Sequence, residues 1–237
     1  MKYIFLAIGI CIILPKSGIS QDYQDDVETP KGGDIEAWVC EEESIANREY
    51  LDYLYSGYSA TFYPTYGTPS SSDQFNCHGY AWYMMSTAGG NNIYDPRWIG
   101  YYNGDDEDLY MSDGSYVEVA SEVYPGKVSW TSHDHSAITT PTSGVYKSKW
   151  CNGPLATHTI ENCPYRINAT VKYYKLCYQE EKNEDYYTNQ LIDGCGIHLE
   201  NVTLYYTVDV EVEFEEWARI HGTFYAPSGT TFEMHPE

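Results

Sequence analysis

The sequence predicts an α+β fold, in which two helical segments precede a series of short antiparallel strands and a strand-rich C-terminal part. Apolar residues recur near helical spacing between residues 35 and 55 and again between residues 77 and 88. From residue 115 onward, short runs rich in Tyr, Val and Thr alternate with turn residues, which is typical of strands. Helices followed by antiparallel strands define the α+β class.

Local signals set the ends of the two predicted helices. The first covers 35–55 and stops before Gly57, and the second runs for about three turns from Cys77 to the Gly89-Gly90 pair. Either Asp73 or Asn76 can supply the N-cap of the second helix, because short polar side chains accept hydrogen bonds from first-turn N–H groups. Cys77 is therefore expected in the first turn.

The remaining pattern divides the chain into a central domain, 35–165, and a β-rich C-terminal module, 166–237. In the central domain we expect strands at 115–120, 126–130, 135–140 and 144–150. The segment after residue 166 alternates apolar and polar residues, has short turns and lacks a helix signal. These features predict a separate all-β unit.

The N-terminal residues predict export. Lys2 precedes an apolar run that ends near Leu14, and Pro15 and small residues follow up to Ser20. This is the pattern of a secretory signal peptide over 1–20, and the run is too short to span a bilayer. We therefore expect a secreted, periplasmic or cell-surface protein with no membrane insertion after cleavage, which begins with an acidic flexible lead-in at 21–34.

Composition excludes two classes of partner. The chain has 13 basic and 35 acidic residues and a formal net charge of −22. Such a charge argues against nucleic acids and anionic membrane surfaces as partners. We interpret the acidic runs as solvated loops, with calcium binding at DDED, from Asp105, as an alternative. The 26 tyrosines indicate strand positions, or alternatively a surface that contacts sugars or peptides.

Six cysteines follow the predicted cleavage site, and an even number in an exported protein suggests disulfides. They are Cys40, Cys77, Cys151, Cys163, Cys177 and Cys195. Pairing between sequence neighbours would join Cys151 to Cys163 and Cys177 to Cys195. Cys77 is then either a free thiol or a half-cystine, and the sequence leaves both readings open.

Cys77 is the candidate nucleophile. A helix N-terminus favours the thiolate form of a cysteine, and hydrolysis also needs an imidazole. Adjacent helical residues point about 100° apart, so we expect His78 not to serve Cys77. His135 opens a predicted strand and is the expected base. His158 is the expected third residue, although Ser148 and Lys149 hold the nearer positions.

Other readings of these residues remain open. His133 and His135 alternate on a strand and could bind zinc together. His158 could equally be an ordinary loop residue.

Three stretches in order, FNCHGYAW, PGKVSW and DHSAI, resemble motifs of NlpC-type and CHAP-type papain-like cysteine peptidases and amidases, over about residues 60–160. The resemblance implies a papain-like core with N-terminal helices packed on an antiparallel sheet. It implies that Cys77 is the nucleophile and His135 the base, and that the helix N-terminus supplies the oxyanion donors. It implies no cofactor or metal. Gly126-Lys127 departs from the glycine-aspartate pair of that family.

The resemblance also implies a substrate. It predicts a secreted cysteine hydrolase that cleaves an amide bond in a peptide or cell-wall substrate, most often a peptidoglycan peptide. The C-terminal module resembles β-rich segments appended to secreted bacterial proteins, which implies attachment. The alternative is a secreted binding or adhesion protein on a catalytically inactive version of the fold.

Overall fold

The structure is a computed structural model. It describes residues 22–65, 67, 69–86, 92–100, 107–130, 134–168, 170–182, 185–186, 190–200, 202–204, 209–221, 225 and 231–236. The expected signal peptide lies outside these residues, so export stays a prediction. Within the described part of the chain, no helix has both the length and the apolar character needed to cross a membrane.

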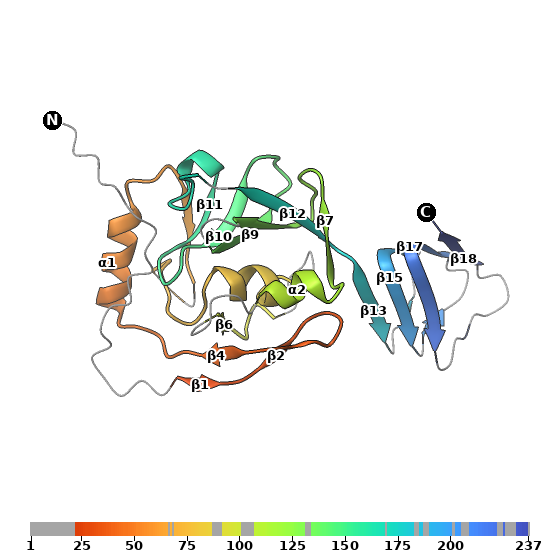
Figure 1. Cartoon of the computed structure of the whole chain (residues 1–237). Coiled ribbons are helices and arrows are strands. Elements are labelled where there is room, and N and C mark those ends of the chain that lie inside the picture. Colours follow the sequence, from red (N-terminus) through yellow and green to blue (C-terminus); the bar gives the residue numbers. More distant parts are fainter. Residues whose placement is uncertain are drawn as a thin grey trace.

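A seven-stranded antiparallel sheet forms the largest element (Figure 1). Its strands are β5 (Thr61–Tyr63), β7 (Tyr116–Val119), β8 (Lys127–Trp130), β9 (His135–Thr139), β10 (Tyr146–Lys149), β11 (Leu155–His158) and β12 (Val171–Leu176). They are arranged in the order β5-β11-β10-β9-β8-β12-β7. The four strands predicted between residues 115 and 150 are confirmed as β7 to β10.

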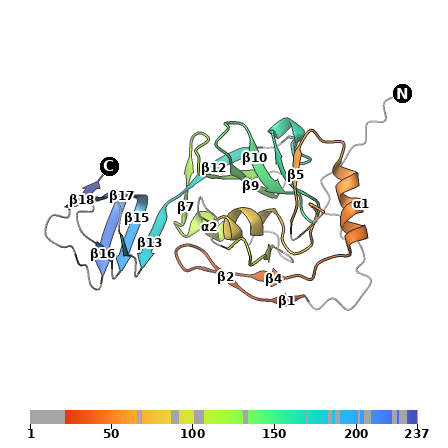
Figure 2. The same ribbon diagram turned by 180° about the vertical axis from the view of Figure 1, so that it is seen from behind.

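Two of the four helices lie between this sheet and a smaller β layer (Figures 1 and 2). The helices are α1 (Ile45–Tyr55), the π-helix η1 (Gly79–Met84), α2 (Asp108–Ser112) and the short 3₁₀ helix η2 (Ile160–Asn162). The smaller layer contains the sheet of β1 (Tyr23–Gln24), β4 (Ala37–Val39) and β6 (Trp98–Ile99) and the pair β2 (Val27–Glu28) and β3 (Asp34–Ile35). Both views show η1 and α2 between the two β layers and α1 at the outer side.

The predicted α+β, papain-like core is wrong, because the structure is mostly β and is built on the large antiparallel sheet. Residues 34–39 form β3 and β4, and the helix begins only at Ile45. Ile35 and Ala37 are both buried two positions apart, which is the period of a strand. On α1, Arg48 and Leu51 are the buried residues, so this helix does not cover the sheet as expected.

Strands also occupy part of the segment expected to be a flexible lead-in. Tyr23 and Gln24 pair with β4, and Val27 is buried in the same core as Ile35. The buried Val27 and the backbone pairing of β1 with β4 anchor an otherwise acidic stretch.

Trp82 is the centre of the packing between the two β layers. Its side chain is fully buried, stacks on Tyr110 at 5.9 Å and meets the edges of Tyr116 and Tyr174 at 5.2 and 5.7 Å. The indole Nε1–H donates to the Ser136 hydroxyl over 2.8 Å. Aromatic pairs of this kind add to the free energy of simple burial, so η1 is held at a fixed height over β9.

The C-terminal residues that the structure describes form parallel strands. They are β13 (Tyr178–Lys182), β14 (Asp185–Tyr186), β15 (Gln190–Glu200), β16 (Thr203–Leu204), β17 (Asp209–His221) and β18 (Thr231–Pro236). One sheet has the order β13-β15-β17-β18, and β14 pairs with β16. Figures 1 and 2 show these strands beyond the β7–β12 end of the large sheet.

The connection to this C-terminal part is direct. β12 lies within the predicted C-terminal module, yet it pairs with β7 and β8 of the large sheet. Cys177 alone separates β12 from β13.

A substitution at Gly79, the glycine of the CHGY motif, can test this packing. A Cβ built on Gly79 would lie 1.8 Å from the backbone oxygen of Arg97, whereas one on Gly57 would meet nothing within 4 Å. We predict that Gly79→Ala lowers the free energy of unfolding by about 3 kcal/mol, because the backbone of β6 must move. Chemical denaturation measures the effect, with Gly57→Ala as the matched control. If Gly79→Ala lowered the free energy of unfolding no more than Gly57→Ala does, this packing would be contradicted.

Candidate functional site

Asn76 fixes the start of the helix that carries Cys77. Its side-chain oxygen accepts from the Gly79 N–H over 2.9 Å, and its carbonyl accepts from the Tyr80 N–H over 3.0 Å. The Asn76 amide also donates to the carbonyl of Ile99. Asn76, one of the two predicted caps, is therefore the capping residue, and Cys77 lies in the first helical turn as predicted.

Two buried cations hold the chain that leads into this helix. Arg48 donates to the carbonyls of Ser71 and Pro69 over 2.6 and 3.0 Å. Lys149 donates to the carbonyls of Ser72 and Cys151, each over 2.7 Å. Burial lowers the pKa of Lys149 to about 7. Lys149 is one of the two nearer alternatives to His158 as third catalytic residue, and its contacts give it a role in holding this loop.

His78 occupies a buried position between η1 and β9 and contacts acidic groups on both sides of its ring. Its Nε2 is 3.1 Å from Asp134 Oδ1, and its Nδ1 is 3.3 Å from Glu107 Oε1. Nδ1 is also 3.0 Å from the Ser136 hydroxyl. Cys77 is close enough to affect the pKa of His78, and the expectation that helix geometry keeps His78 from serving Cys77 stays a prediction.

These contacts set the charge of His78. Burial alone would lower its pKa, but the neighbouring Cys77, Glu107 and Asp134 side chains outweigh burial and hold the pKa well above 6.5. These contacts favour the protonated form of the ring. A thiolate beside an imidazolium is the reactive form of a catalytic cysteine.

The two carboxylates differ in their environments. Burial raises the pKa of Glu107 from 4.5 to about 7, in spite of the nearby charge of His78. Asp134 is largely exposed; burial tends to raise its pKa, but the hydrogen bond and charge of His78 lower it overall. Asp134 also has a positive φ of 46°, a conformation that few non-glycine residues adopt. This backbone conformation directly precedes β9, where Asp134 reaches the His78 ring.

His78, Glu107 and Asp134 also have the residue types of a metal site. Each offers one ligand atom within 4.8 Å of the others. However, the carboxylates engage opposite nitrogens of one ring, an arrangement that matches an imidazolium held by two ion pairs. We therefore interpret this group as an acid–imidazolium cluster.

The alternation of β9 directs His135 away from this cluster. Ser136 faces η1, where it contacts Trp82 and His78. Because neighbouring strand residues project to opposite faces, His135 faces the other side of the sheet. There its ring stacks on Tyr165 at 4.0 Å and lies 5.1 Å from the Trp130 ring. Of the three predicted catalytic residues, Cys77 directly precedes His78 of the acid–imidazolium cluster, whereas His135 lies on the other face of the sheet.

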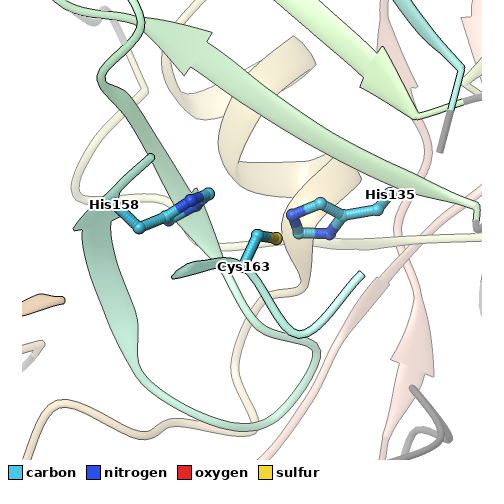
Figure 3. Close-up of side chains that lie close together, drawn as sticks. All are labelled: His135, His158 and Cys163. Carbon is cyan, nitrogen blue, oxygen red and sulfur yellow. The ribbon is translucent and has the colours of Figure 1, made fainter. Parts of the chain in front are cut away.

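His135 and His158 are brought together with Cys163. One donor atom from each of these residues lies within 4.8 Å of the other two. Figure 3 shows Cys163 between the two imidazoles, with its sulfur directed toward His135. His133, the partner proposed for His135 in a zinc site, lies outside the described residues.

The structure corrects one disulfide. Cys77 and Cys163 are free thiols and are buried, whereas Cys151 and Cys177 are disulfide-bonded. The predicted Cys151–Cys163 bond is therefore wrong, and Cys77 is not a half-cystine. The Cys177–Cys195 bond stays a prediction, because the side chain at position 195 lies outside those described.

Glu107 and Asp134 are the functional candidates that sequence reasoning missed. Glu107 belongs to the DDED run that was interpreted as a solvated loop, yet it is buried. Asp134 directly precedes His135, the predicted base, in the DHSAI motif. No protein-family model, curated protein or solved structure matches this chain. The chemistry of the site is therefore argued from its geometry.

The buried cluster predicts a pH-dependent stability. Glu107 has a pKa of about 7 in the folded protein and about 4.5 when unfolded, so the native state binds more protons between these values. Stability therefore falls as the pH rises from about 4.5 through about 7, and His78, whose pKa is also raised, extends the fall above pH 6.5. We predict that Glu107→Gln flattens the lower part of this curve.

Denaturant unfolding between about pH 5 and about pH 8 measures the slope. The matched control is Glu118→Gln, because Glu118 forms an exposed ion pair with Lys172. A Glu107→Gln curve parallel to that of the wild type would show that Glu107 is not protonated in this range.

Proposed function

We propose that the protein is a hydrolase that cleaves amide bonds with Cys77 as the nucleophile and His78 as its imidazole partner. One observation carries the proposal. A free cysteine in the first turn of a helix directly precedes a buried histidine whose two ring nitrogens contact Asp134 and Glu107. Nucleophile, imidazole and orienting carboxylate are the parts that acyl transfer requires.

In this mechanism the Cys77 thiolate attacks the amide carbonyl carbon, and the carbonyl electrons move to oxygen. The imidazolium of His78 donates its proton to the nitrogen of the leaving amine as the tetrahedral intermediate collapses to a thioester. Neutral His78 then removes a proton from water, which attacks the thioester and releases the acid and the thiolate. Asp134 and Glu107 keep the ring oriented through both steps.

Sequence evidence supports the substrate class. The motifs around Cys77 and at DHSAI resemble those of NlpC-type and CHAP-type amidases, which favours peptides and, among them, cell-wall peptides. The net charge of −22 disfavours nucleic acids. The prediction that His135 is the base is a competing assignment within the same proposal, and variants of the two histidines decide between them.

A binding protein is the second candidate. The exposed side of α1 carries Ile45, Tyr50, Tyr53 and Leu54, whose exposed fractions run from 42% to 72%. Apolar and aromatic side chains gathered on one exposed helix are typical of contact surfaces. A secreted binding or adhesion protein would use such a surface without needing Cys77.

Thiol reactivity separates these candidates. We predict that iodoacetamide alkylates Cys77 faster than Cys40 or Cys163 near pH 6.5, because His78 stabilises its thiolate. His78→Asn should slow alkylation of Cys77 at this pH by at least about tenfold. Mass spectrometry of digested samples identifies the modified residue, and Cys40→Ser serves as the control. Equal rates at the three thiols would argue against an activated nucleophile.

Activity is measured with purified muropeptides and mass spectrometry of the products. We predict that Cys77→Ala abolishes cleavage and that His78→Asn lowers kcat by about 10²–10⁴-fold. His135→Asn is the matched variant and should retain activity within about tenfold. If His135→Asn lowered kcat more than His78→Asn did, His135 would be the general base. Wild-type protein that binds muropeptides but releases no product would favour the binding class.

A further inference from the structure

The geometry points to a second site: we propose that His135, His158 and Cys163 bind a zinc-type divalent cation on the face of the large sheet opposite η1. Two imidazoles and one thiol are the donors that zinc prefers, and three protein ligands leave a fourth coordination position open. The donors come from β9, from β11 and from the segment directly after η2, so an ion would join three parts of the chain (Figure 3).

The spacing of the donors is close to that of a tetrahedral site. One donor atom from each residue lies within 4.8 Å of the other two. In a tetrahedron with Zn–N and Zn–S bonds of roughly 2.0–2.3 Å, ligand atoms are roughly 3.3–3.8 Å apart. Each donor therefore has to move by no more than about 1 Å, which a small side-chain rotation provides. In Figure 3 the cysteine sulfur already lies between the two rings.

His158 is oriented like a metal ligand. Its Nδ1–H donates to the Thr159 carbonyl over 3.1 Å, a contact that turns the Nε2 lone pair toward the interior. Metal-binding histidines commonly donate their other N–H in this way. At present Nε2 accepts from the Ser148 hydroxyl over 2.7 Å, and Ser148 accepts from the Trp150 indole over 3.0 Å. Rotation of one hydroxyl group would free Nε2 for an ion.

Burial favours an ion at this position. His135, His158 and Cys163 are at most 2% exposed, and the rings of Trp130 and Tyr165 pack against His135. Zinc binds a neutral imidazole and a thiolate, so binding at these residues would release the Cys163 thiol proton.

The site is separate from the proposed nucleophile. Cys77 lies near Cys163, but the imidazole proposed as its partner, that of His78, contacts Ser136 on the other face of the sheet. A bound ion would occupy His135, which leaves the imidazole of His78 free. The proposed metal binding and the proposed amide hydrolysis can consequently be tested independently of each other.

Cobalt binding tests the proposal directly. Full-length protein is treated with a chelator, dialysed and titrated with Co²⁺ alone. We expect a near-ultraviolet thiolate-to-cobalt band together with the strong visible bands of four-coordinate cobalt. Cys163→Ser should remove the thiolate band and weaken binding by at least about 100-fold. Cys40→Ser is the matched control, because Cys40 is also a buried cysteine, and it should retain the band.

Two further variants keep the test decisive even if Cys163→Ser folds poorly. Ser148→Ala removes the group that competes for His158 Nε2, so it should bind cobalt more tightly by about threefold or more. Cys77→Ser should keep the thiolate band, although the proposed nucleophile is gone. Zinc should raise the Tm of the wild type more than that of Cys163→Ser. A wild-type protein without a thiolate band, or a band that disappears in Cys77→Ser and persists in Cys163→Ser, would overturn the assignment.

Discussion

The arrangement of the central part depends on one hydroxyl group, that of Ser136. It accepts a hydrogen bond from Trp82 and lies 3.0 Å from the His78 ring, so a single β9 residue contacts both the packing centre of η1 and the candidate imidazole. Trp82 cannot shift without breaking this contact or its aromatic contacts with Tyr110 and Tyr116. The position of Cys77 beside His78 follows, because both residues directly precede η1.

Because neighbouring strand residues project to opposite faces, β9 contributes side chains to two separate groups of reactive residues, one on each face of the sheet. Asp134 and Ser136 contact His78 on the helix side, whereas His135 lies with His158 and Cys163 on the other side. A thiol with an imidazole and two carboxylates suits acyl transfer, and a thiol with two neutral imidazoles suits a soft cation. Neither set requires a residue of the other, although both depend on the register of the same strand.

Local signals in the sequence were sufficient for the strands between residues 115 and 150 and for Cys77 at a helix start, because turn residues and the Asn76 cap act over a few positions. They failed for residues 34–39, where burial on alternate positions was obscured by an apparent helical spacing. The proposed pairing of Cys77 with His78 could not be found from sequence spacing alone. It rests on buried charged groups, because Glu107 and Asp134 approach the His78 ring from separate parts of the chain.

The direct passage from β12 into β13 has a mechanical consequence. β12 is bonded on both sides, to β8 and to β7, and only Cys177 separates it from the C-terminal strands. Tension applied at the C-terminus would therefore load two hydrogen-bonded ladders in shear, with many bonds sharing the force. A chain tethered through its C-terminal strands could in this way withstand pulling while the sheet under Cys77 keeps its shape.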